Sequence, residues 1–235
     1  MPRGQAAARA QLTVYAAASL TDVFPKIDPA EKYSFGGSNA LAAQITQGAP
    51  ADVFASANMT LPTTLYTKGL CSKPVVFTRN TLVIVVPTAN PAHIHSIYDL
   101  ARSGIKLDIA GPGVPVGSYT LQILKNMSLS AAVLKNVVSQ ETDVREVLAK
   151  VALGEADAGF VYSTDAKTVP GKVKVIKVPA WAQPKVQYGI CVVSNSPNKT
   201  DAQKFITKIL SKAGQAKMLS YGFLPRVKPK PKKTT

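Results

Sequence analysis

The chain has 235 residues, of which 46% are hydrophobic and 17% are charged, so it can bury a substantial core and is not intrinsically disordered. Its apolar runs are far shorter than the roughly 20 residues that cross a bilayer, so we expect no transmembrane helix. The formal net charge of +15 admits nucleic acid, an anionic membrane surface or an anionic ligand as a partner.

The distribution of the basic residues argues against nucleic acid. Five of the 28 lysines and arginines lie in the last ten residues, and the others are spread along the chain. No basic cluster alternates with aromatic residues, and no zinc-finger spacing is present. We expect residues 1–10 and 227–235 to be flexible termini. The N-terminal residues lack the apolar core of a secretory signal, as would a chain whose leader had been removed, so they do not indicate the compartment.

The first predicted unit is a strand that leads a serine to the start of a helix. Leu12–Tyr15 is a β-branched and aromatic run typical of a buried strand, and three alanines follow it. Ser19 and Asp22 have the spacing of a helix capping box. A helix N-terminus has unpaired N–H groups and a positive dipole end, so Ser19 and these amides suit an anion. An isolated motif of this kind more often only caps its own helix.

The same arrangement recurs along the chain. Ser38 follows a predicted strand and two glycines, Val116 lies in a loop before a predicted helix, and Thr142–Val144 opens another helix. The predicted strands are 12–15, 32–35, 51–56, 81–87, 105–110, 136–138, 159–162 and 186–193, and the predicted helices begin at 19 and span 40–45, 61–70, 97–103, 119–125, 142–153 and 201–219. This alternation predicts parallel sheets with helices on both faces, in which ligands bind beyond the carboxyl ends of the strands. Two lobes facing each other across a cleft would bring these helix starts together.

Few residues favour catalysis or a metal ion. The loop Gly111–Gly117 resembles a dinucleotide fingerprint, but its third glycine comes one residue late and no acidic residue follows at the ribose position. His93 and His95 have no acidic residue or cysteine nearby, so we expect a surface loop rather than a metal site. No Gly-x-Ser-x-Gly hydrolase elbow occurs. We therefore expect a protein that is not an enzyme, with no catalytic residues, no cofactor and no direct ligands to a metal cation.

The two cysteines leave the redox compartment open. Cys71 and Cys191 are far apart in the sequence and do not have a metal-ligand spacing. They are compatible with one disulfide in an oxidising compartment or with two small buried residues.

Six short motifs, taken in order, resemble those of one family. They are Ala16–Thr21 (AAASLT), Gly37–Ala42 (GSNALA), Gln47–Phe54 (QGAPADVF), Val114–Gly117 (VPVG), Asp143–Arg145 (DVR) and Gly154–Tyr162 (GEADAGFVY). The set resembles the molybdate-binding proteins of bacterial ABC transporters, and the resemblance runs from Leu12 to Phe223. The sequence departs from the commoner family pattern at Val116, where alanine is usual, and at Gly36–Asn39, where a Ser-Ser pair is commoner.

The resemblance implies an α/β protein with a type II periplasmic-binding-protein fold, in which two α/β lobes are joined by two crossing strands with a ligand cleft between them. We expect residues 11–84 and 190–226 to form lobe 1 and residues 85–189 to form lobe 2. The resemblance also implies hydroxyl, phenol and backbone N–H donors to a tetrahedral oxyanion. These donors belong to Ser19, Ser38, Val116, Val144 and Tyr162.

The implied ligand is molybdate or tungstate. Both are fully ionised near neutral pH and need only donors, whereas hydrogen phosphate carries a proton and requires an acceptor. The resemblance further implies an ABC permease in the membrane as partner, a periplasmic or membrane-anchored extracytoplasmic location, and a monomer that binds no nucleic acid. Two alternatives stay open: a receptor for sulfate or another oxyanion, and the ligand-sensing module of a transcriptional regulator, although no helix-turn-helix segment is evident.

Overall fold

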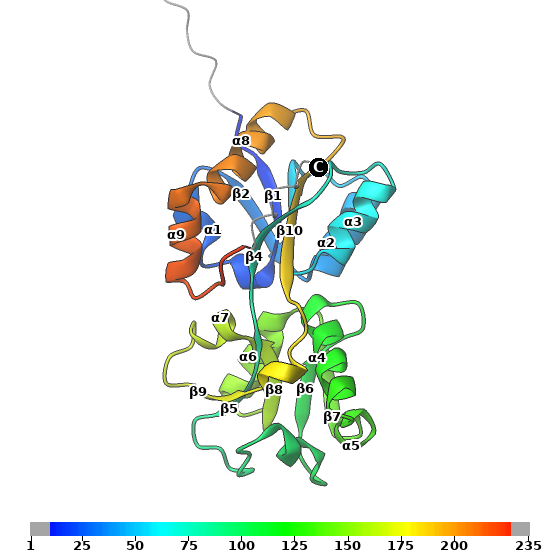
Figure 1. Ribbon diagram of the computed structural model, residues 1–235, viewed down its shortest axis with the longest axis vertical. Helices are drawn as coiled ribbons and strands as arrows, with labels where there is room; N and C mark the ends of the chain where they lie inside the picture. Colours follow the sequence, from blue (N-terminus) through cyan, green and yellow to red (C-terminus); the bar gives the residue numbers. More distant parts are fainter. Residues whose placement is uncertain (1–9, 227–235) are drawn as a thin grey trace, which may run out of the picture.

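The computed structural model describes residues 10–226, which form two lobes, each built on one five-stranded sheet (Figure 1). The basic tail and almost all of the two predicted flexible termini lie outside the described residues. No helix in the described part of the chain combines the length and the apolar character that a bilayer crossing requires.

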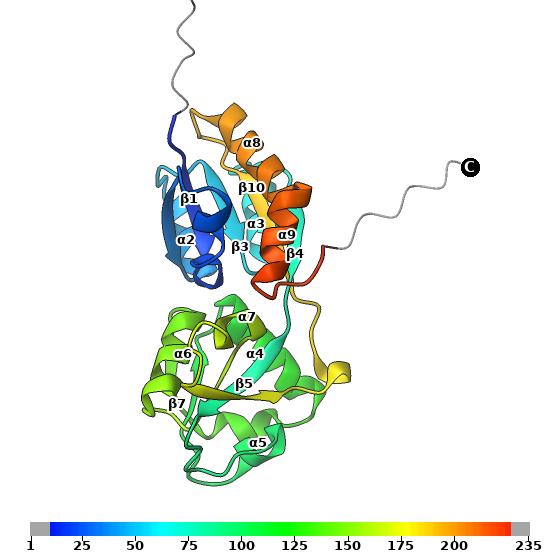
Figure 2. The ribbon, with the colours of Figure 1, turned by 90° about the vertical axis from the view of Figure 1, so that its left-hand side faces the viewer.

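Lobe 1 contains the first four strands and the last one. Its sheet has the order β2-β1-β3-β10-β4, with helices packed on both faces (Figure 2). The strands are β1 (Thr13–Ala17), β2 (Lys32–Gly36), β3 (Val53–Ser56), β4 (Val75–Arg79) and β10 (Gln187–Val192). The helices are the 3-10 helix η1 (Ala18–Leu20), α1 (Phe24–Ile27), α2 (Ser38–Thr46), α3 (Thr60–Thr67), α8 (Lys199–Leu210) and α9 (Lys212–Ser220).

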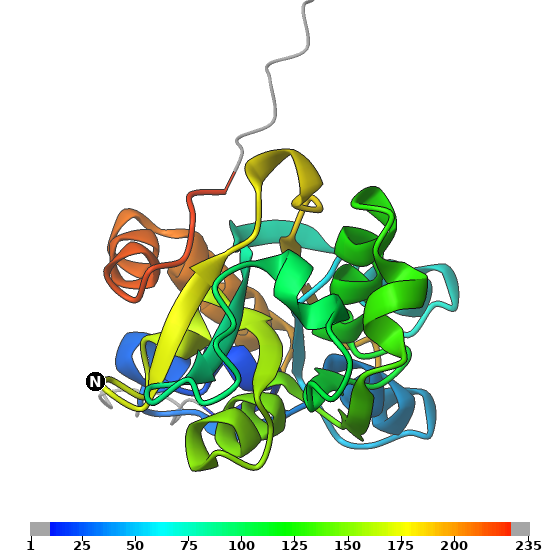
Figure 3. The same cartoon turned by 90° about the horizontal axis from the view of Figure 1, so that it is seen from below.

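Lobe 2 is formed by the middle of the chain. Its sheet has the order β7-β6-β8-β5-β9, and Figure 3 shows this lobe from below. The strands are β5 (Leu82–Pro87), β6 (Leu107–Ala110), β7 (Val137–Glu141), β8 (Ala158–Tyr162) and β9 (Val173–Lys177). The helices are α4 (Pro115–Asn126), α5 (Ser130–Leu134), α6 (Val144–Leu153) and α7 (Ser163–Ala166), with the 3-10 helices η2 (Ile97–Ala101) and η3 (Ala180–Ala182).

The chain crosses between the lobes twice, as the predicted fold class requires. It leaves lobe 1 between β4 and β5 and returns between β9 and β10. The predicted lobe boundaries at 84/85 and 189/190 fall inside β5 and β10. The strand pairing shows that the chain enters the lobe 2 sheet at Leu82 and re-enters the lobe 1 sheet at Gln187. The Gln183 side chain ties the two crossings together, because its Nε2 donates to the Leu82 carbonyl (2.6 Å) and its Oε1 accepts from the Leu82 N–H (3.1 Å).

The prediction of parallel sheets was wrong for the strands that follow a crossing. β1 runs parallel to β2 and β3, and β6 runs parallel to β7 and β8, but β10 and β5 run antiparallel to their neighbours. The reason is geometric. A strand that enters a lobe from the cleft runs away from it, whereas the parallel strands end at it.

Several predicted helix boundaries were also wrong. The helix predicted over 119–125 begins at Pro115, whose fixed φ suits the first helical position. The helix predicted over 201–219 is two helices, because the Ser211 side chain accepts from the Gly214 N–H and starts α9. The short helix predicted over 97–103 is a 3-10 helix that ends at Ala101. β4, β9, α5 and α7 were not predicted.

Both cores are largely apolar. In lobe 1, Phe24 packs against Phe77 and Phe205 with ring centroids 5.8 Å apart in each pair. Cys71 and Cys191 are free thiols in a second buried cluster of the same lobe. The two thiols are neighbours within this cluster.

One buried carboxyl group interrupts the core of lobe 2. Asp108 in β6 is fully buried, and neither of its oxygens has a hydrogen-bond partner among the described residues. Burial and the nearby Glu141 raise the pKa of Asp108 to about 7, although Lys150 partly opposes this. Asp108 therefore favours its neutral form.

This raised pKa predicts a pH-dependent stability. The pKa of an unfolded aspartate is about 4, so the folded chain binds more protons between about pH 4 and pH 7, and the free energy of unfolding falls as pH rises through this window. We expect Asp108→Asn to remove the part of this fall that Asp108 contributes, roughly 1–4 kcal/mol. The part due to Asp165, whose pKa burial raises to about 6, should remain. Urea unfolding at a series of pH values measures it. Glu155→Gln, an exposed acid in the same lobe, should keep the wild-type slope, and an unchanged slope in Asp108→Asn would contradict the assignment.

Candidate functional site

A small cavity lies where the two lobes meet. The space between its lining atoms is about 210 Å³ when the open solvent at its mouth is included. All five predicted site residues line it, together with several small residues and one acid. The lining residues are Ala17, Ala18, Ser19, Gly36, Gly37, Ser38, Ala57, Val114, Pro115, Val116, Asp143, Val144 and Tyr162. The cavity thus collects the ends of β1, β2, β3 and β8 and the starts of α2, α4 and α6.

Ser19 reaches the cavity from η1, and its predicted capping role was wrong. No side chain caps η1 or α1, and the Ser19 hydroxyl instead lies 2.9 Å from the hydroxyl of Tyr188 on β10. Asn80, in the first crossing, approaches the Tyr188 hydroxyl with its Nδ2 (3.5 Å). If Tyr188 accepts from Asn80 and donates to Ser19, the Ser19 proton is free to point into the cavity.

Ser38 is the first residue of α2. Its Oγ accepts a hydrogen bond from the Ala57 N–H (3.1 Å), which leaves the hydroxyl proton available for another acceptor. The first amides of α2 have no acceptor within the helix. Ala57 was not among the predicted site residues. It directly follows the last residue of β3, and Ser19 likewise lies shortly after the end of β1. Its position at the end of a strand was the signal that could have identified it.

Two helices of lobe 2 point their first amides at the cavity. Val116 is the second residue of α4, after Pro115, which has no N–H. α4 starts close to β6, since a Cβ at Gly117 would collide with the carbonyls of Ala110 and Gly111. Val144 is the first residue of α6. The Val116 and Val144 side chains are buried and apolar. Both residues can therefore donate to a ligand in the cavity only through their backbone N–H groups.

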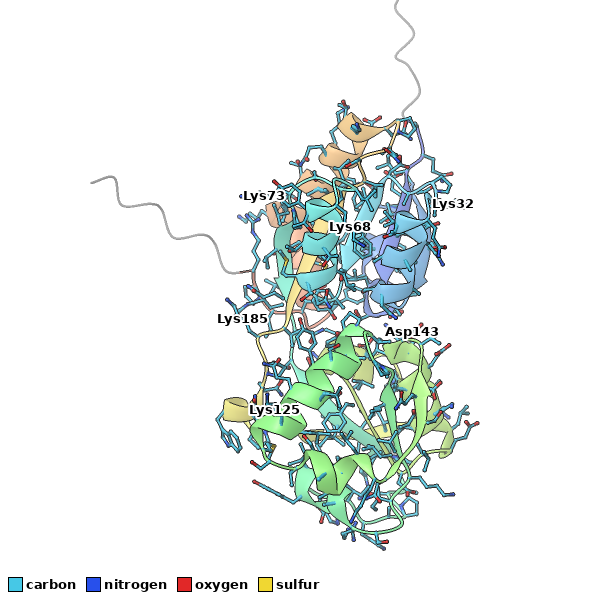
Figure 4. The ribbon with its side chains drawn as sticks, turned by 90° about the vertical axis from the view of Figure 1, so that its right-hand side faces the viewer. Lys32, Lys68, Lys73, Lys125, Asp143 and Lys185 are labelled. Atoms are coloured by element: carbon cyan, nitrogen blue, oxygen red, sulfur yellow. The ribbon has the colours of Figure 1, made fainter. Side chains whose placement is uncertain are left out.

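Asp143 adds a carboxylate that the predicted donor set did not include. Its Oδ1 accepts from the N–H groups of Arg145 (2.6 Å) and Glu146 (3.2 Å), so Asp143 is the N-cap of α6. Desolvation raises the pKa of this carboxyl group. Figure 4 shows Asp143 at the boundary between the lobes.

Tyr162 ends β8 and is 1% exposed. Its hydroxyl has no hydrogen-bond partner among the described residues, which is costly for a buried polar group. Burial raises the pKa of Tyr162 well above its ordinary value, so the phenol keeps its proton and remains a donor.

The chemistry of the cavity is that of neutral donors. None of the described residues that line it is a lysine, arginine or histidine. The lysines labelled in Figure 4 instead lie apart from one another on both lobes. The described residues hold no group of three side chains suited to a metal cation, and His93 and His95 are exposed. Such a site can hold an anion through hydrogen bonds at helix N-termini.

The two lobes approach each other closely beside the cavity. A Cβ on Gly37 of lobe 1 would collide with the carbonyl oxygen of Thr142 of lobe 2. Gly37 has φ −60°, which any residue can adopt, so the glycine is required here by space and not by backbone conformation. The lack of a side chain at this position allows the cleft to close.

Two lobes joined by two crossing segments, with donors from both lobes around one cavity, define a two-lobed solute-binding protein. A family model described as bacterial extracellular solute-binding protein matches residues 12–224, and the chain belongs to this family.

Comparisons with individual proteins agree with this assignment. The molybdate-binding protein ModA of Mycobacterium tuberculosis is 36% identical over 232 residues, which cover 94% of this chain and 87% of that protein. The periplasmic molybdate-binding protein of Azotobacter vinelandii has a similar fold, with a TM-score of 0.79 at 23% identity over 94% of this chain and 100% of that one. The sulfate-binding protein SubI of Mycobacterium tuberculosis also has a TM-score of 0.79, at 19% identity over 92% of this chain and 87% of that one. The family resemblance and the fold class predicted from the sequence are confirmed.

The contact at Gly37 predicts that a methyl group there keeps the lobes apart. We expect Gly37→Ala to increase the radius of gyration measured by small-angle X-ray scattering and to leave the unfolding temperature nearly unchanged. Gly36→Ala is a matched control, because a Cβ at Gly36 would meet only the Leu41 side chain at 4.0 Å. Equal scattering curves for the two variants would show that the Gly37 contact does not limit closure.

Proposed function

We propose that this protein captures molybdate or tungstate with neutral donors from both lobes and delivers it to an ABC permease. The observation that carries the proposal is that one cavity is lined by all five predicted donors: Ser19, Ser38, Val116, Val144 and Tyr162. The buried Tyr162 hydroxyl supports it further, because a bound oxyanion would supply the missing acceptor. The curated molybdate-binding relative matches nearly the whole chain.

Neutral donors are sufficient for useful affinity. A hydrogen bond to a charged acceptor contributes roughly 1.5–3 kcal/mol. A micromolar dissociation constant corresponds to a binding free energy of about −8 kcal/mol. Several such hydrogen bonds supply this free energy even after the cost of association is subtracted. The unpaired helix starts are fixed by the fold, so little ordering is needed when the ligand arrives.

Closure of the cleft links capture to delivery. Ser19 and Ser38 belong to lobe 1, whereas Val116, Val144 and Tyr162 belong to lobe 2. All five can donate to one anion only when the lobes are together, so the ligand favours the closed state and release requires opening. We propose that this opening occurs at the permease, outside the cytoplasm, and that the protein acts as a monomer without a cofactor.

A sulfate receptor is the second candidate. Sulfate is also fully ionised near neutral pH, and a sulfate-binding protein shares the fold. The two ligand classes differ in size, so the dimensions of the closed cavity decide between them. Val116, where the family more often has alanine, is the residue most able to change these dimensions.

Calorimetric titration with molybdate, tungstate, sulfate and phosphate tests the proposal. We expect molybdate and tungstate to bind with micromolar or tighter dissociation constants and to raise the unfolding temperature, because a ligand that binds only the folded state stabilises it. Phosphate should not bind, since its proton needs an acceptor that the donors do not offer. Tight sulfate binding without molybdate binding would favour the second candidate, and phosphate binding would indicate that Asp143 serves as an acceptor.

Tyr162→Phe tests the phenol as a donor. The substitution removes one hydroxyl and little volume, and we expect it to weaken molybdate binding by roughly 1.5–3 kcal/mol, or about tenfold to a hundredfold. Tyr119→Phe is a matched control on a tyrosine of the same lobe that does not line the cavity. If Tyr162 were only a core residue, the variant would bind molybdate as the wild type does.

A further inference from the structure

We infer that Arg145 is a positioning residue that holds the closed cleft by joining the three segments that carry Ser19, Val144 and Tyr162. The inference rests on the proposed function, because it concerns how fast the captured anion is released. Arg145 does not line the cavity and was not among the predicted site residues.

Within lobe 2 the guanidinium group is held in place. Its Nε donates to Asp165 Oδ1 (2.6 Å), and its Nη1 donates to Thr168 Oγ1 (3.2 Å). Asp165 is fully buried, and the Arg145 side chain is only 26% exposed. The guanidinium is therefore ordered by contacts that lie entirely within lobe 2 and that survive when the cleft opens.

The third guanidinium nitrogen, Nη2, forms a hydrogen bond with lobe 1. Nη2 donates to Oδ2 of Asp22 (2.5 Å), which lies between η1 and α1 of lobe 1 and is 43% exposed. This ion pair exists only when the lobes are together. It differs in this respect from Lys150–Glu141 and Lys204–Asp201, in which both partners belong to one lobe.

The three partners stand next to the donors in the sequence. Arg145 directly follows Val144, Asp165 is three residues after Tyr162, and Asp22 is three residues after Ser19. Because these segments are short, the ion pair fixes the positions of donors from both lobes. An interaction made only in the closed state slows opening and leaves the encounter of the open protein with the ligand unaffected.

The strength of the Asp22–Arg145 pair follows from its surroundings. Exposed ion pairs contribute little, partly because two long side chains must be ordered. Here the arginine is ordered in advance by Asp165, and aspartate is short, so less entropy is lost on closure. We therefore expect a measurable effect on release, larger than that of an ordinary surface pair.

Asp22→Asn tests the inference, because it removes the charge of the exposed partner without disturbing the buried Asp165. Stopped-flow displacement of the bound oxyanion should show a dissociation rate about threefold to tenfold faster than in the wild type, with a nearly unchanged association rate. Added salt should accelerate release from the wild type more than from the variant. Asp22→Glu, which keeps the charge, should restore part of the slow release.

Asp201→Asn is the matched control. It makes the same chemical change in the same lobe and breaks an ion pair within α8. The dissociation rate of this variant should equal that of the wild type. If Asp22→Asn behaved in the same way, Arg145 would serve lobe 2 alone and the inference would be wrong.

Failure of the proposed function is distinguishable from failure of this inference. If none of the four oxyanions binds the wild type, the proposed function is wrong. The ion pair is then judged by small-angle X-ray scattering at low salt, where Asp22→Asn should have a larger radius of gyration than both the wild type and Asp201→Asn. Equal radii for the three proteins would overturn the inference.

Discussion

The first N–H groups of α2, α4 and α6 are the constraint on which the rest of the structure depends. In α6 the Asp143 side chain accepts from the N–H groups of Arg145 and Glu146, so the N–H of Val144 is the one that this cap leaves. A helix cannot satisfy its own first amides, and a buried amide without an acceptor is costly. In this protein the three helix starts meet at one cavity between the lobes. Small residues lie next to these helix starts. Ala17 and Ala18 lie where β1 ends and η1 begins. Gly37 lets the backbone of Thr142 come close, and Gly117 does the same for the backbone of Ala110 and Gly111. The two-lobed arrangement can be understood as the means of bringing these starts together and separating them again.

Polar contacts connect this cavity to the first crossing between the lobes. Asn80 lies in the first crossing between the lobes and donates to the Thr164 hydroxyl (2.9 Å), while its Oδ1 accepts from Ser163 (3.0 Å). Through Tyr188 the same residue is linked to Ser19 at the cavity wall. The crossing, the end of β8 and the end of β1 therefore share one buried network. Hydrogen bonds thus run without a break from the first crossing to the cavity wall.

The charge of the protein and the chemistry of its cavity are separate properties. The net charge of +15 belongs to the whole chain, whereas the cavity wall has no basic side chain among its described residues and contains the carboxylate of Asp143. A lysine or arginine in the cavity would attract every anion, whatever its protonation state. Fixed neutral donors instead favour an anion that offers only acceptors, and they do so at short range. The basic surface can act on the rate of encounter, but at physiological salt its influence falls off within about 8 Å.

Local patterns in the sequence predicted where strands end and helices start, the family resemblance implied the donors, and the tertiary structure determined what surrounds these residues. A strand, a few small residues and a helix start form a local signal, so Ser38, Val144 and Tyr162 could be placed at the ends of strands or the starts of helices from the sequence. The direction of β5 and β10 could not, because it follows from the point at which the chain enters each lobe. Ser19 was assigned to a capping box since its partner Tyr188 is 169 residues away, and the pair between Asp22 and Arg145 spans 123 residues. Contacts at such separations depend on how the two lobes pack, and no periodicity or spacing within one segment records them.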